Sequence, residues 1–173
     1  VKSVTIINDD FALVTLSVAS GQIGEDTGAT TTTVTATLDI TSVADVVVNL
    51  TATGTAIRGT DYNLPLTITV PTGSKIASVV LSSIGDTLYE RVEDVMISIA
   101  SIVGGLEAGL PTKQQLKVDI LNDEAIPTVS LSVGVGNNGS IGEVTGSTTV
   151  TASLSLGSGL DVTVPLIKGS AAI

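Results

Sequence analysis

Val34-Thr35-Ala36-Thr37-Leu38-Asp39-Ile40 is the stretch that determines the fold class, because apolar and polar side chains alternate along all of it. Successive side chains of a β-strand point to opposite faces of the sheet, so this alternation predicts a strand with one buried face. The same spacing recurs over residues 46–50, 66–70, 95–99 and 116–120. No stretch with the period of an amphipathic helix competes with this pattern.

Turn-forming residues separate the alternating runs, as at Gly54, Pro71-Thr72-Gly73 and Gly104-Gly105. With further strands near 12–19 and 75–82, the pattern predicts about seven strands in about 115 residues. We therefore expect an all-β protein, an antiparallel β-sandwich of immunoglobulin type.

The composition limits both the core and the range of functions. Hydrophobic residues make up 43% of the 173 residues, yet there is no Trp, one Phe and two Tyr, so the core must consist of Val, Ile, Leu and Ala. A net charge of −10 argues against nucleic acid and anionic membranes as partners. No apolar run approaches the roughly 18 residues of a membrane span, so we expect no direct membrane insertion.

Internal repetition is the most informative feature of the chain. Six short segments recur in the same order at a spacing of about 115 residues. The matched pairs are 4–10 with 118–124, 14–18 with 129–133, 23–25 with 141–143, 34–38 with 150–154, 45–48 with 161–164, and 54–56 with 169–171. We expect an excerpt of a tandem array, in which 1–9 is the last strand of one repeat, 10–124 a complete repeat, and 125–173 the first strands of the next.

Acidic residues gather in four connections of the complete repeat. Glu25 follows the first predicted strand, Asp61 the third, the run 86–94 the fifth, and Asp123 and Glu124 the seventh. If the strands alternate up and down, all four connections lie at the same end of the sandwich.

These segments together resemble the Calx-β family. The resemblance lies in Gly54-Thr55-Ala56 leading to Asp61-Tyr62, in the acidic run 86–93, and in the strand that ends Ile120-Leu121-Asn122-Asp123-Glu124. That family includes regulatory domains of sodium–calcium exchangers and large bacterial surface proteins. The resemblance implies a sandwich that binds Ca²⁺ at the loops beside the following domain. The ligands implied here are Glu25, Asp61, Asp86, Glu90, Glu93, Asp123 and Glu124, with Leu88 through its carbonyl.

Two departures from the resemblance limit the expected number of ions. Gly85 and Asn122 stand where the richest sites of the family have acids, so we expect one or two ions. Clustered carboxylates suit Ca²⁺, which takes six to eight oxygen ligands. The absence of His and Cys disfavours zinc, and Mg²⁺ prefers to keep its waters. The alternative is neutralisation by scattered bases, namely Arg58, Lys75, Arg91, Lys113 and Lys117.

An enzymatic function is not expected. Without His and Cys, the usual general base and the thiol nucleophile are missing. Glu90 and Glu93 could supply the two carboxylates of a glycosidase, but three aromatic residues offer little surface for a sugar.

The function expected is that of a calcium-binding structural repeat in an extracellular or cell-surface, adhesin-like or filamentous bacterial protein. Ions between repeats would stiffen the array. The expected partners are neighbouring repeats of the same polypeptide, with a homopolymer possible if Val4-Thr5-Ile6-Ile7 of one molecule completes the open repeat of another by strand exchange. The alternatives are a regulatory calcium sensor and a metal-free spacer.

Overall fold

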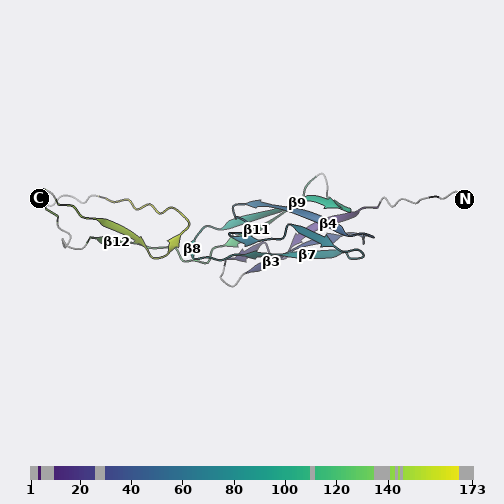
Figure 1. The fold of residues 1–173 in the computed structure, drawn as a ribbon, viewed down its shortest axis with the longest axis horizontal. Helices are drawn as coiled ribbons and strands as arrows, with labels where there is room; N and C mark the ends of the chain where they lie inside the picture. Colours follow the sequence, from purple (N-terminus) through teal and green to yellow (C-terminus); the bar gives the residue numbers. More distant parts are fainter. Residues whose placement is uncertain are drawn as a thin grey trace. The chain divides into compact units, whose positions relative to one another are not determined.

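A computed structural model describes residues 4, 10–25, 30–109, 112–134, 141–142, 144 and 146–167 (Figure 1). The chain forms two compact units. Unit 1 is Val1–Asp86 with Arg91–Asn122, and unit 2 is Thr87–Glu90 with Asp123–Ile173. Over the described residues, no helix has the length and apolar character needed to span a membrane.

Unit 1 is a β-sandwich of two five-stranded sheets. In the order in which they lie side by side in the first sheet, the strands are β10 (Gly105–Glu107), β1 (Ala12–Val18), β3 (Thr31–Leu38), β7 (Ile76–Ser83) and β5 (Tyr62–Asn63). Across the second sheet they are β2 (Gln22–Gly24), β11 (Gln115–Leu121), β9 (Glu93–Val103), β4 (Val46–Gly54) and β6 (Thr67–Val70). The predicted all-β sandwich is therefore confirmed.

Two short parallel pairs were not predicted. β1 pairs with β10 in the first sheet, and β2 pairs with β11 in the second, both in parallel. The first predicted strand, near 12–19, corresponds to β1, and after it the chain turns at Ser20 and Gly21 and forms the unpredicted strand β2 in the opposite sheet. One segment thus contributes a strand to each sheet: β1 lies inside the first sheet beside the edge strand β10, and β2 is itself an edge strand of the second sheet. Edge strands as short as β2 and β10 limit pairing with other chains.

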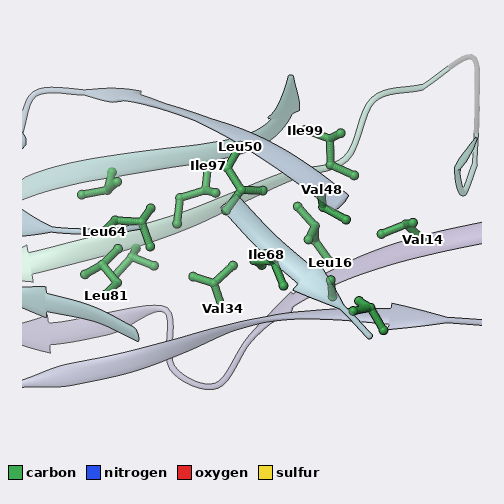
Figure 2. Close-up of a cluster of buried hydrophobic side chains, with 14 of the residues drawn as sticks. Val14, Leu16, Val34, Val48, Leu50, Leu64, Ile68, Leu81, Ile97 and Ile99 are labelled. Carbon is green, nitrogen blue, oxygen red and sulfur yellow. The ribbon is translucent and has the colours of Figure 1, made fainter. Parts of the chain in front are cut away.

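The core consists of aliphatic side chains from both sheets, as the composition predicted (Figure 2). Val14, Val34, Val48 and Ile97 are completely buried. Tyr62 is the aromatic exception, with only 2% of its surface exposed. Close packing of small branched residues explains how a sandwich forms without Phe or Trp in its core.

The prediction that Ile40 points into the core is wrong. β3 ends at Leu38, and Ile40 is 41% exposed. The Asp39 carboxylate ends the strand because its Oδ1 accepts the backbone N–H groups of Leu13 (2.7 Å) and Ile40 (2.8 Å). Asp side chains commonly bind nearby backbone donors and turn the chain in this way.

Among the described residues of unit 2 there are two separate strand pairs. β12 (Val129–Val133) pairs with β13 (Val150–Leu154) in antiparallel orientation, and β14 (Gly157–Ser158) pairs with β8 (Leu88–Tyr89) in parallel. The strand predicted within 1–9 lies outside the described residues except for Val4. The predicted repeat boundaries stay a prediction.

Candidate metal site

The strand register of unit 1 brings several strand ends to one end of the sandwich, here called the acidic pole. In the second sheet, Gly24 lies opposite Leu121, and Ile120 lies opposite Glu93. On the other side of β9, the last residue of β4, Gly54, lies opposite Val95. In the first sheet, the last residue of β7, Ser83, lies opposite Tyr62. The ends of β2, β4, β7 and β11 and the start of β9 therefore meet at the acidic pole.

Glu25 is held at this pole directly after β2. Its backbone N–H donates to the carbonyl of Leu121 at 2.9 Å, and only 4% of its surface is exposed. Asp123 and Glu124 follow Leu121 in the chain by two and three residues, so they start from the strand end to which Glu25 is bonded. Asp123 is exposed and Glu124 is half-buried.

Asp61 occupies a tightly bonded turn after β4. Its backbone N–H donates to the carbonyl of Ile57 at 2.9 Å, and its Oδ2 accepts the Ile57 N–H at 2.5 Å. Its own carbonyl accepts the N–H of Ile84 at 2.8 Å, which ties the turn to the end of β7. These bonds fix the direction of the Asp61 carboxylate, and only 9% of the surface of Asp61 is exposed.

Gly54 explains why this turn can approach β9. Its φ is +133°, and a Cβ built there would lie 2.1 Å from the Asp94 carbonyl oxygen. Glycine tolerates both the dihedral angle and the close approach. The Gly54-Thr55-Ala56 motif of the sequence thus has a steric reason.

The remaining predicted ligands belong to the connection between β7 and β9. Glu93 begins β9 in unit 1 and is half-buried, whereas Asp86 is exposed. Leu88 lies in β8 of unit 2, where Gly157 is its partner in the ladder, and the half-buried Glu90 follows β8. The role of the Leu88 carbonyl as a ligand stays a prediction.

Two groups of three carboxylates among the described residues could hold a metal ion. The first contains Glu25, Asp123 and Glu124, and the second contains Asp61, Glu90 and Glu93. Six of the seven predicted acidic ligands are thus represented, and Asp86 belongs to neither group. The donors are all carboxylate oxygens, which suits a hard cation such as Ca²⁺ and offers nothing specific to a soft metal.

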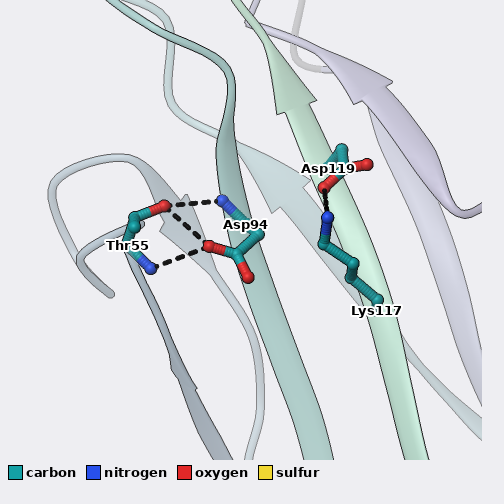
Figure 3. Close-up of polar contacts among 4 residues, drawn as sticks. All are labelled: Thr55, Asp94, Lys117 and Asp119. Atoms are coloured by element: carbon teal, nitrogen blue, oxygen red, sulfur yellow. Dashed lines mark hydrogen bonds and ion pairs between the residues drawn. The ribbon is translucent and has the colours of Figure 1, made fainter.

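Asp94 has a different role that sequence reasoning missed (Figure 3). Its Oδ1 accepts the Thr55 hydroxyl at 2.8 Å and the Thr55 N–H at 3.1 Å, while the Thr55 hydroxyl oxygen accepts the Asp94 N–H at 2.9 Å. The hydroxyl bond and then the backbone bond lower the pKa of the Asp94 carboxyl. Asp94 therefore fastens the start of the Asp61 turn to β9.

Lys117 and Asp119 form an ion pair beside Asp94 on the outer face of β11 (Figure 3). The two charged atoms are 2.8 Å apart, and the bond to Asp119 raises the pKa of Lys117. The base Lys117 is thus engaged with a carboxylate that is not a predicted ligand. This contact weakens the alternative in which Lys117 neutralises the ligand carboxylates.

Comparison with solved structures identifies the class of fold. The crystal structure of the apo form of the Calx CBD1 domain covers 66% of this chain and 99% of its own length, with a TM-score of 0.50 and 23% identity. The calcium binding domain CBD12 of CALX1.1 covers 80% of this chain and 69% of its own, with a TM-score of 0.50 and 16% identity. The described sandwich has the fold of these Calx domains, and the resemblance to Calx-β domains is confirmed at the level of the fold. No protein-family model and no curated protein matches the sequence.

Proposed function

We propose that this chain is a calcium-binding structural repeat that uses the acidic pole as its ion site. The two groups of three carboxylates at that pole are the observation on which the proposal rests. The fold shared with the calcium binding domain CBD12 of CALX1.1 supports it.

The donor set fits Ca²⁺ in chemistry and in local rigidity. Glu25 is only 4% exposed, and the attraction between its carboxylate and a cation is screened less by water there than at an exposed position. Asp61 is oriented by its bonds to Ile57, so little entropy would be lost when its carboxylate binds an ion. Asp123 and Glu90 lie in more accessible segments and would complete the coordination with water and backbone oxygens.

The finer part of the proposal concerns the chain that follows β11. Asp123 and Glu124 begin the segment that leads to β12, so an ion bound by them and by Glu25 would restrain that segment. In a tandem array, such restraint would stiffen the joint between successive repeats. The acidic, Thr- and Val-rich composition supports an extracellular or cell-surface setting in an adhesin-like or filamentous protein, without catalytic activity.

The direct test is thermal unfolding of the metal-free chain with Ca²⁺ or Mg²⁺. Calcium at 100-fold above its dissociation constant should add about 2.7 kcal/mol per site and raise the Tm by several degrees. Magnesium should do much less. The variants Asp123→Asn and Glu90→Gln, one from each carboxylate group, should each reduce the calcium effect. Asp10→Asn, which removes one exposed charge outside both groups, is the matched control and should leave the effect intact.

The calcium affinity separates the structural repeat from its two alternatives. A dissociation constant of roughly 0.1–1 mM is typical of extracellular structural modules, whereas sensors bind at roughly 0.1–10 µM. A value in the sensor range would replace the structural role by a regulatory one. A melting curve unchanged by both cations would leave the metal-free spacer.

A further inference from the structure

The antiparallel strand pair β12–β13 in unit 2 has the same register as the pair β1–β3 in unit 1, and each pair is called a hairpin here although β2 separates β1 from β3 in the chain. In unit 1, Val14 lies opposite Leu38 and Leu16 opposite Ala36. At the repeat-equivalent positions of unit 2, Val129 lies opposite Leu154 and Leu131 opposite Ala152. All five residue pairs of the two ladders correspond in this way.

The hydrogen bonds that close the two hairpins also correspond. Asp39 N–H donates to the Leu13 carbonyl at 3.1 Å, and Ser155 N–H donates to the Thr128 carbonyl at 2.9 Å. In return, the Leu13 N–H donates to Asp39 Oδ1 at 2.7 Å, and the Thr128 N–H donates to Ser155 Oγ at 2.9 Å. At the other end, Ala19 N–H donates to Thr33 O, and Gly134 N–H donates to Thr149 O.

The apolar face of the second hairpin is nevertheless exposed. Val129, Leu131, Val150 and Leu154 are all at least 40% exposed, whereas their equivalents in unit 1 belong to the core. A groove of about 250 Å³ lies on this face of unit 2. It is lined by Val129, Ala152, Leu154, Val162 and Val164, whose repeat equivalents Val14, Ala36, Leu38, Val46 and Val48 are at most 2% exposed.

Unit 1 shows which strand lies beside β3. In an antiparallel ladder, alternate residues direct their backbone groups to opposite neighbours. Leu38 N–H donates to Lys75 O at 2.7 Å, so the even-numbered residues of β3 bond to β7 while the odd-numbered ones bond to β1. The bond to Thr149 O places the odd-numbered residues of β13 toward β12, and Val150, Ala152 and Leu154 therefore direct their backbone groups to the opposite edge.

We propose that this edge of β13 accepts a β-strand with the residue pattern of Ile76–Ser83, in the register in which β3 pairs with β7. In the part of unit 2 that the structure describes, the sheet contains only β12 and β13. An added strand of this pattern would pair with the backbone of Val150, Ala152 and Leu154. Its Ala, Val and Leu side chains at the positions of 77, 79 and 81 would extend the apolar face. The proposal does not depend on calcium binding.

The register of the added strand can be tested by disulfide cross-linking, because the chain has no cysteine. Thr35 lies opposite Ser78 on the outer face, with hydroxyl oxygens 2.9 Å apart, and the equivalent of Thr35 is Thr151. Such non-hydrogen-bonded pairs have Cα atoms about 4.5 Å apart, within the range that disulfides span. The full chain with Thr151→Cys should cross-link to a synthetic peptide of residues 74–84 that contains Ser78→Cys.

Exchanging the cysteine positions provides the matched control. Thr149→Cys, equivalent to Thr33, should prefer the peptide with Val80→Cys, and each mismatched combination should give several-fold less product. Equal yields from all four combinations would overturn the proposal, because random collision would explain them.

Hydrogen exchange of the unsubstituted chain gives an independent readout. The peptide without cysteine should slow exchange of the Val150, Ala152 and Leu154 amides more than that of Thr151 and Ser153, which face β12. A scrambled peptide should slow none of them. Absence of slowing at the first three amides would also reject the proposal.

Discussion

The hairpins β1–β3 and β12–β13 have the same register and the same closing hydrogen bonds, but opposite burial. In unit 1 the inward-facing residues of the hairpin lie in a core that both sheets build. In unit 2 every residue of β12 and β13 is exposed. The comparison separates the register of a strand pair from its burial, two properties that are usually observed together.

Register is determined locally, and burial is determined by the rest of the sandwich. The alternation of apolar and polar side chains and the closing bonds at Asp39 or Ser155 are present within each hairpin alone. Val14 and Leu38 share their core with residues of the second sheet, most of whose strands come from distant parts of the chain. Two-stranded hairpins are marginal in water, so the covering strands supply most of the stability.

The largest effect should come from removing the same leucine side chain in the two hairpins. Leu38→Ala should lower the free energy of unfolding of unit 1 by about 2–5 kcal/mol, since it leaves a cavity in a packed core. Leu154→Ala should change the free energy of unfolding of unit 2 by less than about 0.5 kcal/mol, as is usual for exposed positions outside special features. Urea unfolding followed by Tyr62 fluorescence in a Tyr89→Phe background measures unit 1, and Tyr89 fluorescence in a Tyr62→Phe background measures unit 2.

Equal losses of unfolding free energy from the two leucine substitutions would contradict the difference in burial between the two hairpins. They would mean that Leu154, 40% exposed here, is covered in solution by a core as complete as that around Leu38.

A smaller effect should come from removing the closing side chains. Asp39→Ala removes acceptors for the Leu13 and Ile40 N–H groups, and a hydrogen bond typically contributes about 0.5–1.5 kcal/mol net. Unit 1 should lose stability by about that amount. Ser155→Ala should leave the unfolding of unit 1 unchanged and should accelerate hydrogen exchange at the Thr128 amide. If Ser155→Ala does not alter that exchange, the closing bond at Ser155 contributes less to the stability of its hairpin than the closing bond at Asp39 does.

The sequence was sufficient to predict the sandwich because strand alternation is a local property. Residues 34–38 show it without reference to the rest of the chain, and the core of Val, Ile, Leu and Ala followed from the scarcity of aromatic residues. The short strand β2 and the parallel pairings of β1 with β10 and of β2 with β11 could not be predicted, because the partners β10 and β11 lie far away in the chain. At Ile40, the alternation of apolar and polar residues continues in the sequence, but the strand has already ended, because the Asp39 side chain accepts the Ile40 N–H.

The candidate site was predictable in its location and less so in its details. Alternating strand directions place the connections with Glu25 and Asp61 at one end, which the register of unit 1 bears out. Burial of these carboxylates depends on bonds to Leu121 and Ile84, which no local pattern reveals. Composition also could not distinguish Asp94, which binds Thr55, from the acids that remain candidate ligands.

The smallest effect should appear at alkaline pH, in the buried tyrosine of unit 1. Burial, and then the negative charge of Asp61, raise the pKa of the Tyr62 hydroxyl, while Arg58 opposes the shift. The folded state therefore retains this proton at pH values where the unfolded chain, with a tyrosine pKa of about 10, loses it. The associated stability is present below that value and is lost as the pH rises through the folded pKa.

Urea midpoints measured between pH 8 and pH 12 should thus fall more steeply for the natural chain than for Tyr62→Phe. Both proteins contain Tyr89 of unit 2 and the same lysines, so the difference in slope isolates Tyr62. Parallel curves would show that water reaches the Tyr62 hydroxyl in the folded protein. The end of unit 1 next to Asp61 would then be as open to solvent as the hairpin of unit 2, and the contrast between the two units would be limited to their aliphatic residues.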